Sequence, residues 1–106
     1  MAEPSLVHTV YFSLKNNDPA QVRSLIDACH SYLTDHPGVI SFGVGTHVTD
    51  LTREVNQTFD VSLHVHFETR SAHDAYQVHP RHLEFIATQK DSWQSVRIYD
   101  TYLPES

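Results

Sequence analysis

Residues 76–85 read YQVHPRHLEF, and this stretch predicts one helix that ends at a proline and a second helix that begins on it. The residue before a proline is forced out of the α region, whereas proline itself fits the first helical turn. His79 therefore lies at the break, and His82 lies just inside the second helix. Because the break gathers the phenol of Tyr76 and two imidazoles, it is a candidate site as well as an architectural signal.

The elements around this stretch predict the fold. Alternation of apolar residues predicts four strands, over residues 6–14, 39–48, 58–68 and 93–103. Helical spacing predicts a helix that Asp18 caps, that begins at Pro19 and that ends near His36-Pro37-Gly38. The order βαββαβ predicts an α+β chain with the ferredoxin-like fold, a four-stranded antiparallel sheet with helices on one face. We expect one domain over residues 1–106.

The predicted strand over residues 58–68 shows the two faces of the sheet most clearly. Its apolar side chains are expected to face the helices: Phe59, Val61, Leu63, Val65 and Phe67. Its polar side chains, His64 and His66 among them, share the other face with Tyr11 of the first strand. A second copy of the chain is the simplest way to cover that face.

Composition and charge exclude several classes of function. The 106 residues are 40% hydrophobic and 19% charged, which is typical of a globular domain. The formal net charge of −6, with scattered basic residues, argues against a nucleic-acid partner and against an anionic membrane surface. Residues 1–5 lack the basic and apolar regions of a signal peptide, and the single cysteine, Cys29, falls on a helical apolar stripe. We expect a cytoplasmic protein without an intrachain disulfide.

The sequence resembles the stress-responsive A/B barrel domain family, part of the dimeric α+β barrel superfamily. The residues that carry the resemblance are 76–85 with its His-Pro-x-His pattern, 36–39, 7–10, 59–68, Asp91 and 98–100. The resemblance implies a homodimer whose two sheets pack face to face as a barrel. Each subunit would hold a pocket between its helices and its own sheet. The implied dimer interface contains Tyr11, His64 and His66, and the implied pocket contains His8, Val10, Phe12, Cys29, Val61, Leu63, Tyr76, His79, His82 and Phe85.

A plant polyketide cyclase of this family suggests which residues would do chemistry. By resemblance, His82 matches its general base, Tyr76 matches the tyrosine that works with the base, and His8 matches a pocket histidine. Val61 and Cys29 stand where the cyclase has a further histidine and tyrosine, so the groups that orient its substrate are absent. An imidazole can remove a proton α to a carbonyl, and a phenol can hold the resulting oxyanion. The expected ligand is therefore a small apolar or carbonyl-containing molecule.

Several alternatives stay open from the sequence. A structural stress-response protein would need no catalysis, and a cofactor-independent cyclase or monooxygenase would use the same pocket. The chain has no phosphate-cradling glycine motif, so we expect no cofactor. His64 and His66 of two copies could meet as a metal site across a two-fold axis, but one chain does not complete a ligand set, and we expect no metal. If the same two histidines are buried between subunits, protonation at about pH 5–6 would weaken the dimer.

Overall fold

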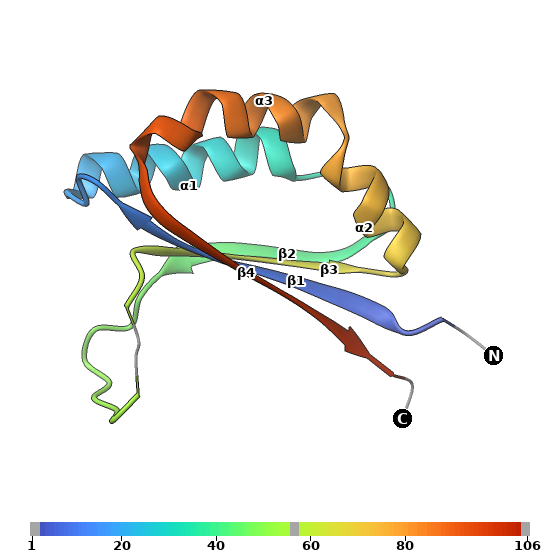
Figure 1. The fold of residues 1–106 in the computed structure, drawn as a ribbon, viewed down its shortest axis with the longest axis horizontal. Coiled ribbons are helices and arrows are strands. Elements are labelled where there is room, and N and C mark those ends of the chain that lie inside the picture. Colours follow the sequence, from blue (N-terminus) through green and yellow to red (C-terminus); the bar gives the residue numbers. More distant parts are fainter. Residues whose placement is uncertain (1–2, 56–57, 105–106) are drawn as a thin grey trace.

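The computed structural model describes residues 3–55 and 58–104, which form a four-stranded antiparallel sheet with its helices on one face (Figure 1). The strands are β1 (Ser5–Leu14), β2 (Val39–Thr46), β3 (Val61–Phe67) and β4 (Trp93–Leu103). The helices are α1 (Pro19–Leu33), α2 (Arg70–Gln77) and α3 (Pro80–Gln89), and a short 3₁₀ turn, η1 (Lys90–Ser92), leads into β4. The strand order β2-β3-β1-β4 confirms the predicted ferredoxin-like arrangement.

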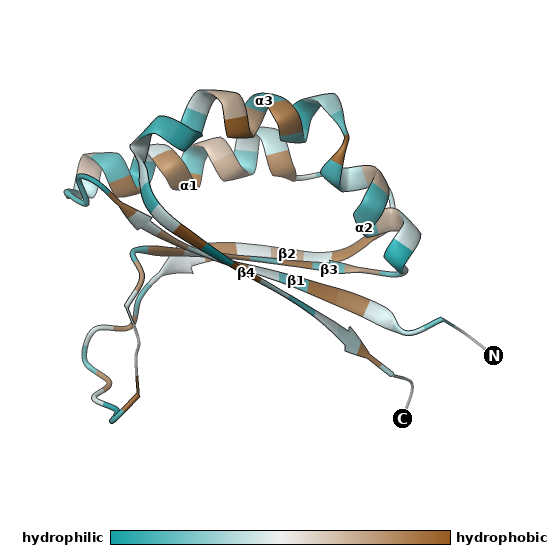
Figure 2. Ribbon diagram, in the orientation of Figure 1, coloured by the Kyte–Doolittle hydropathy of each residue, from teal (hydrophilic) through white to brown (hydrophobic). Residues whose placement is uncertain are grey.

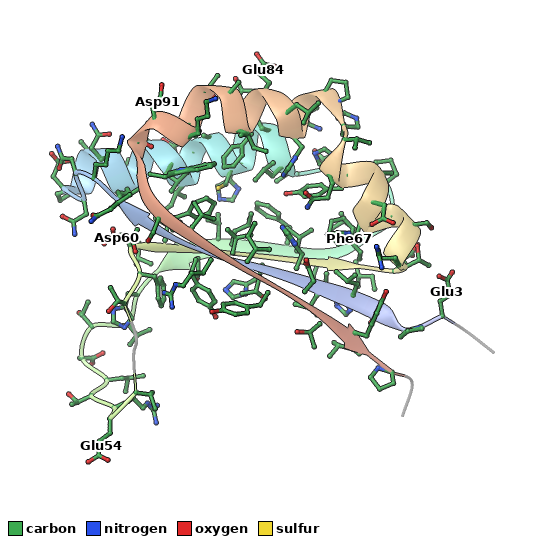
Figure 3. The ribbon with its side chains drawn as sticks, in the orientation of Figure 1. Glu3, Glu54, Asp60, Phe67, Glu84 and Asp91 are labelled. Atoms are coloured by element: carbon green, nitrogen blue, oxygen red, sulfur yellow. The ribbon has the colours of Figure 1, made fainter. Side chains whose placement is uncertain are left out.

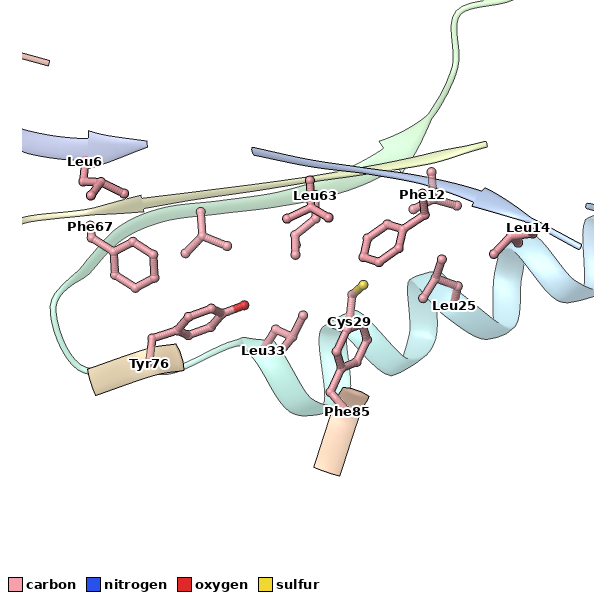
Figure 4. Packing of buried hydrophobic residues seen from close by; sticks show 13 residues of the cluster. Leu6, Phe12, Leu14, Leu25, Cys29, Leu33, Leu63, Phe67, Tyr76 and Phe85 are labelled. Carbon is pink, nitrogen blue, oxygen red and sulfur yellow. The ribbon is translucent and has the colours of Figure 1, made fainter. Parts of the chain in front are cut away.

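β1 lies at the centre of the sheet, paired with β3 on one side and β4 on the other. Its burial alternates along the whole strand, as predicted: Leu6, His8, Val10, Phe12 and Leu14 are buried. These side chains pack under α1 and α3, whose apolar surfaces turn toward the sheet (Figure 2). The core is therefore a layer between the sheet and the helices (Figure 4).

Local signals fix the helix ends. Asp18 caps α1 as predicted, because its carboxylate accepts the backbone N–H of Gln21 at 2.9 Å. Thr69 caps α2. The Thr69 backbone is extended, and its hydroxyl accepts the N–H of Ala72 at 3.2 Å.

Two contacts bring the helices together. The guanidinium of Arg81 donates to the backbone oxygens of Ser31 and Thr34 at 2.9 and 3.0 Å, where it meets the negative end of the α1 dipole. Before β2, Gly38 has a φ of 80°. A Cβ at that position would lie 2.5 Å from Cβ of Ala72, so the glycine permits the close approach of α2.

Phe59 departs from the predicted pattern. The pairing of β1 with β3 ends at Phe12 and Val61. Residue 59 lies outside the paired strand, so its side chain need not follow the alternation of buried and exposed side chains along β3. The ring of Phe59 lies 5.0 Å from that of Tyr11 and 4.8 Å from that of His47, on the sheet face away from the helices. Assigning Phe59 to the core was therefore wrong.

Residues 49–55, which follow β2, form an irregular loop. The loop projects from the helix-free side of the sheet and carries Glu54 at its far end (Figure 3). The register of β2 against β3 shifts between Val39 and Ser41. Within residues 3–55 and 58–104, every helix is too short or too polar to cross a membrane.

Candidate functional site

The helix break at Pro80 positions His82. The backbone of His79 is extended, and its Nδ1 accepts the N–H of Arg81 at 3.1 Å, which caps α3. In a continuous helix that N–H would bond to the carbonyl of Gln77, four residues earlier. The break leaves this carbonyl to the imidazole of His82, whose Nδ1 lies 3.1 Å from the oxygen. The sequence of the junction thus sets the orientation of the His82 ring.

The contact with Gln77 also sets the protonation of His82. A carbonyl oxygen only accepts, so Nδ1 carries the proton and the neutral ring holds its lone pair on Nε2. Burial lowers the pKa of His82 below its ordinary value, and the hydrogen bond to Gln77 opposes this shift. His82 is therefore neutral near pH 7, as a general base must be.

Tyr76 lies beside His82 with its ring almost fully enclosed. The ring centroids of the two residues are 4.6 Å apart, and Tyr76 is 2% exposed. Its hydroxyl has no hydrogen-bond partner among the residues that the structure describes. It points between the sheet and α1, toward Leu63 and Leu33 (Figure 4). Burial raises the pKa of the phenol, so the group is a proton donor.

Both side chains line a cavity of about 130 Å³ between the sheet and α3. Seven of the predicted pocket residues line it: His8, Val10, Phe12, Leu63, Tyr76, His82 and Phe85. The other lining residues are Leu33, Gln77, Ile86, Trp93, Val96 and Ile98. The walls are mostly apolar, and the polar groups gather around the end of α2.

Three residues predicted for the pocket do not line this cavity. Cys29 and Val61 are fully buried in the core, and burial raises the pKa of the Cys29 thiol to about 12. His79 uses its ring to cap α3, which turns it toward His36, with the ring centroids 4.7 Å apart. It lines a separate hollow of about 80 Å³ with His36 and Pro37.

Sequence reasoning missed the groups around His8. Nδ1 of His8 lies 2.5 Å from Oδ1 of Asp100, which stands directly opposite it in the register of β1 and β4. His73 of α2 adds a third polar group, with its Nε2 3.6 Å from the same oxygen. A sequence signal existed for Asp100, a carboxylate that follows Val96 and Ile98 on an otherwise apolar strand face. Burial lowers the pKa of His8, while its bond to Asp100 acts in the opposite direction.

The open sheet face holds the residues predicted for a dimer interface. Tyr11 contacts His64 edge to face, with the ring centroids 6.4 Å apart. His64 pairs with Ser62 at 3.1 Å, and the ring of His66 pairs with the hydroxyl of Ser5 at 2.8 Å. A hollow of about 530 Å³ opens on this face beside Tyr11. The interface itself stays a prediction.

Comparison with known proteins agrees with the fold. The Stress responsive A/B Barrel Domain family matches residues 6–103, and the chain belongs to this family. A dimeric ferredoxin-like protein of unknown function from Thermobifida fusca shares 19% identity, with coverage of 95% of this chain and 92% of that chain and a TM-score of 0.80. A Dabb family protein with a ferredoxin-like fold from Mesorhizobium loti shares 19% identity, with coverage of 98% and 100% and a TM-score of 0.80. Hydroxynitrile lyase from Passiflora edulis shares 17% identity, with coverage of 97% and 96% and a TM-score of 0.75. No curated protein matches the chain.

Proposed function

We propose that the chain binds a small carbonyl-containing molecule in the cavity of Tyr76 and His82, and that His82 acts on it as a general base. The observation that carries this proposal is the buried hydroxyl of Tyr76, which has no partner in the described part of the chain and stands beside a neutral imidazole. A buried hydroxyl without a partner costs about 1–3 kcal/mol of folding free energy. A ligand carbonyl that accepts from Tyr76 would recover that energy.

The two groups have complementary roles in the proposed chemistry. Nε2 of His82 removes a proton from the carbon next to the carbonyl, and the electron pair of the broken C–H bond forms an enolate. Tyr76 donates its hydroxyl to the enolate oxygen, where charge develops. The imidazolium that results keeps its Nδ1–H bond to the carbonyl of Gln77, which stabilises the charged ring.

The size and walls of the cavity set the class of ligand. Its volume, about 130 Å³, is below the roughly 300–1,000 Å³ of sites for drug-sized ligands and near the ~150 Å³ of a cavity that holds benzene. The apolar walls would supply binding by burial, and the polar groups would fix the carbonyl. The Passiflora edulis relative is a hydroxynitrile lyase, which supports lyase-type chemistry on this fold.

Hydrogen–deuterium exchange at carbon tests the proposed base directly. The chain is incubated in D₂O with cyclohexanone, acetophenone and butanal, and loss of the α-proton signals is followed by ¹H NMR. We expect exchange above the buffer rate for at least one compound, and a loss of about 10²–10⁴-fold in His82→Gln, the range that a general base contributes. His64→Gln, on the open face, is the matched control and should retain the exchange rate. A folded His82→Gln protein with undiminished exchange would show that His82 is not the base.

We also propose that two copies pair through the open sheet face. Tyr99 and Leu103 lie on this face at 54% and 43% exposure, and the Thermobifida fusca relative is described as dimeric. Large apolar groups of this kind are usually covered in a partner interface. Sedimentation equilibrium of the wild type should give twice the chain mass of 12.1 kDa. The variant Tyr11→Glu, which places a charge on this face, should sediment with the mass of one chain. A wild-type chain that sediments as a monomer at micromolar concentration would contradict the pairing.

A further inference from the structure

We propose that His8, His73 and Asp100 form a binding site for one divalent transition-metal ion per chain, beyond the function proposed for the cavity. Each residue offers one ligand atom, and the three atoms lie within 4.8 Å of one another. Nδ1 of His8 is 2.5 Å and Nε2 of His73 is 3.6 Å from Oδ1 of Asp100. Two imidazoles and one carboxylate form a ligand set that suits zinc, iron(II) and their neighbours.

The cluster is held by regular structure. His8 and Asp100 are paired across the neighbouring strands β1 and β4, and α2 brings His73 over them, with ring centroids of the two histidines 5.3 Å apart. The site lies at the end of the sheet where α2 crosses it (Figure 1). His8 is buried, and the side chain of His73 is only 12% exposed. The ligand atoms are therefore kept close before any ion arrives.

The tautomer of His73 presents a nitrogen lone pair on the side of Asp100. Its Nδ1 lies 3.0 Å from the carboxylate of Asp74, which accepts, so Nδ1 carries the proton and Nε2 holds the lone pair. That nitrogen lies 3.6 Å from Oδ1 of Asp100, and it accepts from the side-chain amide of Gln77 at 3.4 Å. A metal ion bound by Asp100 and His73 would take the place of this amide as the partner of Nε2. The outer carboxylate of Asp74 matches the partner that metal-bound histidines commonly use on their other nitrogen.

The surroundings give the ion charge balance and room for a further ligand. Asp74 and Asp100 contribute two negative charges, and Arg70 contributes one positive charge while it donates to Asp74 at 2.9 Å and to the hydroxyl of Tyr102 at 3.2 Å. A hollow of about 250 Å³, lined in part by Leu6, His73 and Asp100, reaches the cluster from outside. Three protein ligands would leave at least one position for water or a small anion from this hollow.

Metal binding would rearrange one proton. The ion replaces the proton between His8 and Asp100, and their ligand atoms separate from 2.5 Å to the roughly 3 Å that two ligands on one metal require. With Nδ1 on the metal, the proton of neutral His8 moves to Nε2. Since His8 also lines the cavity, the metal would fix its second nitrogen as a donor at the edge of that cavity.

Titration of the chelator-treated full chain with ZnCl₂ tests the site, with CoCl₂ as a spectroscopic probe. We expect one ion per chain by calorimetry and visible ligand-field bands with cobalt. Asp74→Asn should weaken zinc binding by about 10–100-fold, the usual effect of an outer partner, and His73→Gln should weaken it by more. The matched control is the double variant His64→Gln/His66→Gln, which changes two histidines that lie close together on β3. This variant should bind zinc as tightly as the wild type does.

Two results would overturn the metal site. The first is a wild-type chain that binds no zinc at millimolar concentration. The second is zinc binding that is lost in the His64/His66 double variant but kept in His73→Gln. His73 is partly exposed at the rim, so His73→Gln should fold, and Asp100→Asn gives a second test from the other side of the ion. Because zinc binding is read without any substrate, failure of the His82 chemistry does not affect this result.

Discussion

Replacing Tyr76 with phenylalanine should make the protein more stable and less able to bind its ligand. The ring is 2% exposed and packs against Phe67 and His82 at centroid distances of 5.1 and 4.6 Å. Tyr76→Phe keeps that packing and removes only the hydroxyl, which has no partner among the described residues. The folded state would then bury one unsatisfied polar group fewer.

The expected gain follows from the cost of that hydroxyl. Leaving a buried polar group unpaired costs about 1–3 kcal/mol, so Tyr76→Phe should raise the free energy of unfolding by about 1 kcal/mol or more. For a chain near 100 residues, 1 kcal/mol corresponds to roughly 4–8 °C in Tm. The same change should weaken binding of a carbonyl ligand, because the donor to its oxygen is lost.

Urea unfolding and a ligand titration together measure both effects. Tyr102→Phe is the matched control, since Tyr102 is 50% exposed and its hydroxyl accepts from a surface arginine, Arg70, at 3.2 Å. That control should change stability by less than about 0.5 kcal/mol. If Tyr76→Phe instead lowers stability by about 1 kcal/mol or more, the hydroxyl is hydrogen-bonded in the folded protein, and the reasoning for the cavity fails.

Three further predictions follow from the same structure. Because burial lowers the pKa of His82 below the ~6.5 of an unfolded chain, the unfolded chain takes up its proton first as pH falls. The contribution of His82 to stability is therefore complete above about pH 6.5, and it is lost as the pH falls below that value, by at most about 1.4 kcal/mol per pH unit. Urea unfolding at several pH values should show that the free energy of unfolding depends less steeply on pH in His82→Gln than in the wild type. Gly38→Ala should lower the free energy of unfolding by about 1–3 kcal/mol, since φ is 80° and the new methyl group would meet Ala72. An unchanged midpoint of urea unfolding would contradict this backbone conformation of Gly38. Cys29, fully buried with a pKa of about 12, should react with a thiol reagent only as fast as the chain opens, so rapid labelling of the native protein would refute its burial.

Alternation and capping signals were sufficient to predict most of the fold. The period-two pattern of β1 and the Asp18 cap depend on residues that are close together in the sequence, and both are present in the folded chain. Phe59 failed because the pattern continued past the point where strand pairing ends, and pairing is what enforces alternation. The ring of His79 does not line the cavity of Tyr76 and His82, because it caps α3 and faces His36.

The candidate site was only half visible in the sequence. Tyr76 and His82 are six positions apart, and the proline between them indicated that both could face one side. The pair of His8 and Asp100 is separated by 92 positions, so only the register of β1 and β4 reveals it. His73 reaches the same pair through the packing of α2, which no pattern in the helix specifies.

A crystal structure of the chain soaked with cyclohexanone tests the central claim most directly. We predict that the ligand lies in the cavity, with its carbonyl oxygen at about 2.7 Å from the hydroxyl of Tyr76 and an α-carbon facing Nε2 of His82. Cyclohexanone bound elsewhere, with the Tyr76 hydroxyl bonded to a group of the protein, would contradict the claim that these two residues form a ligand site.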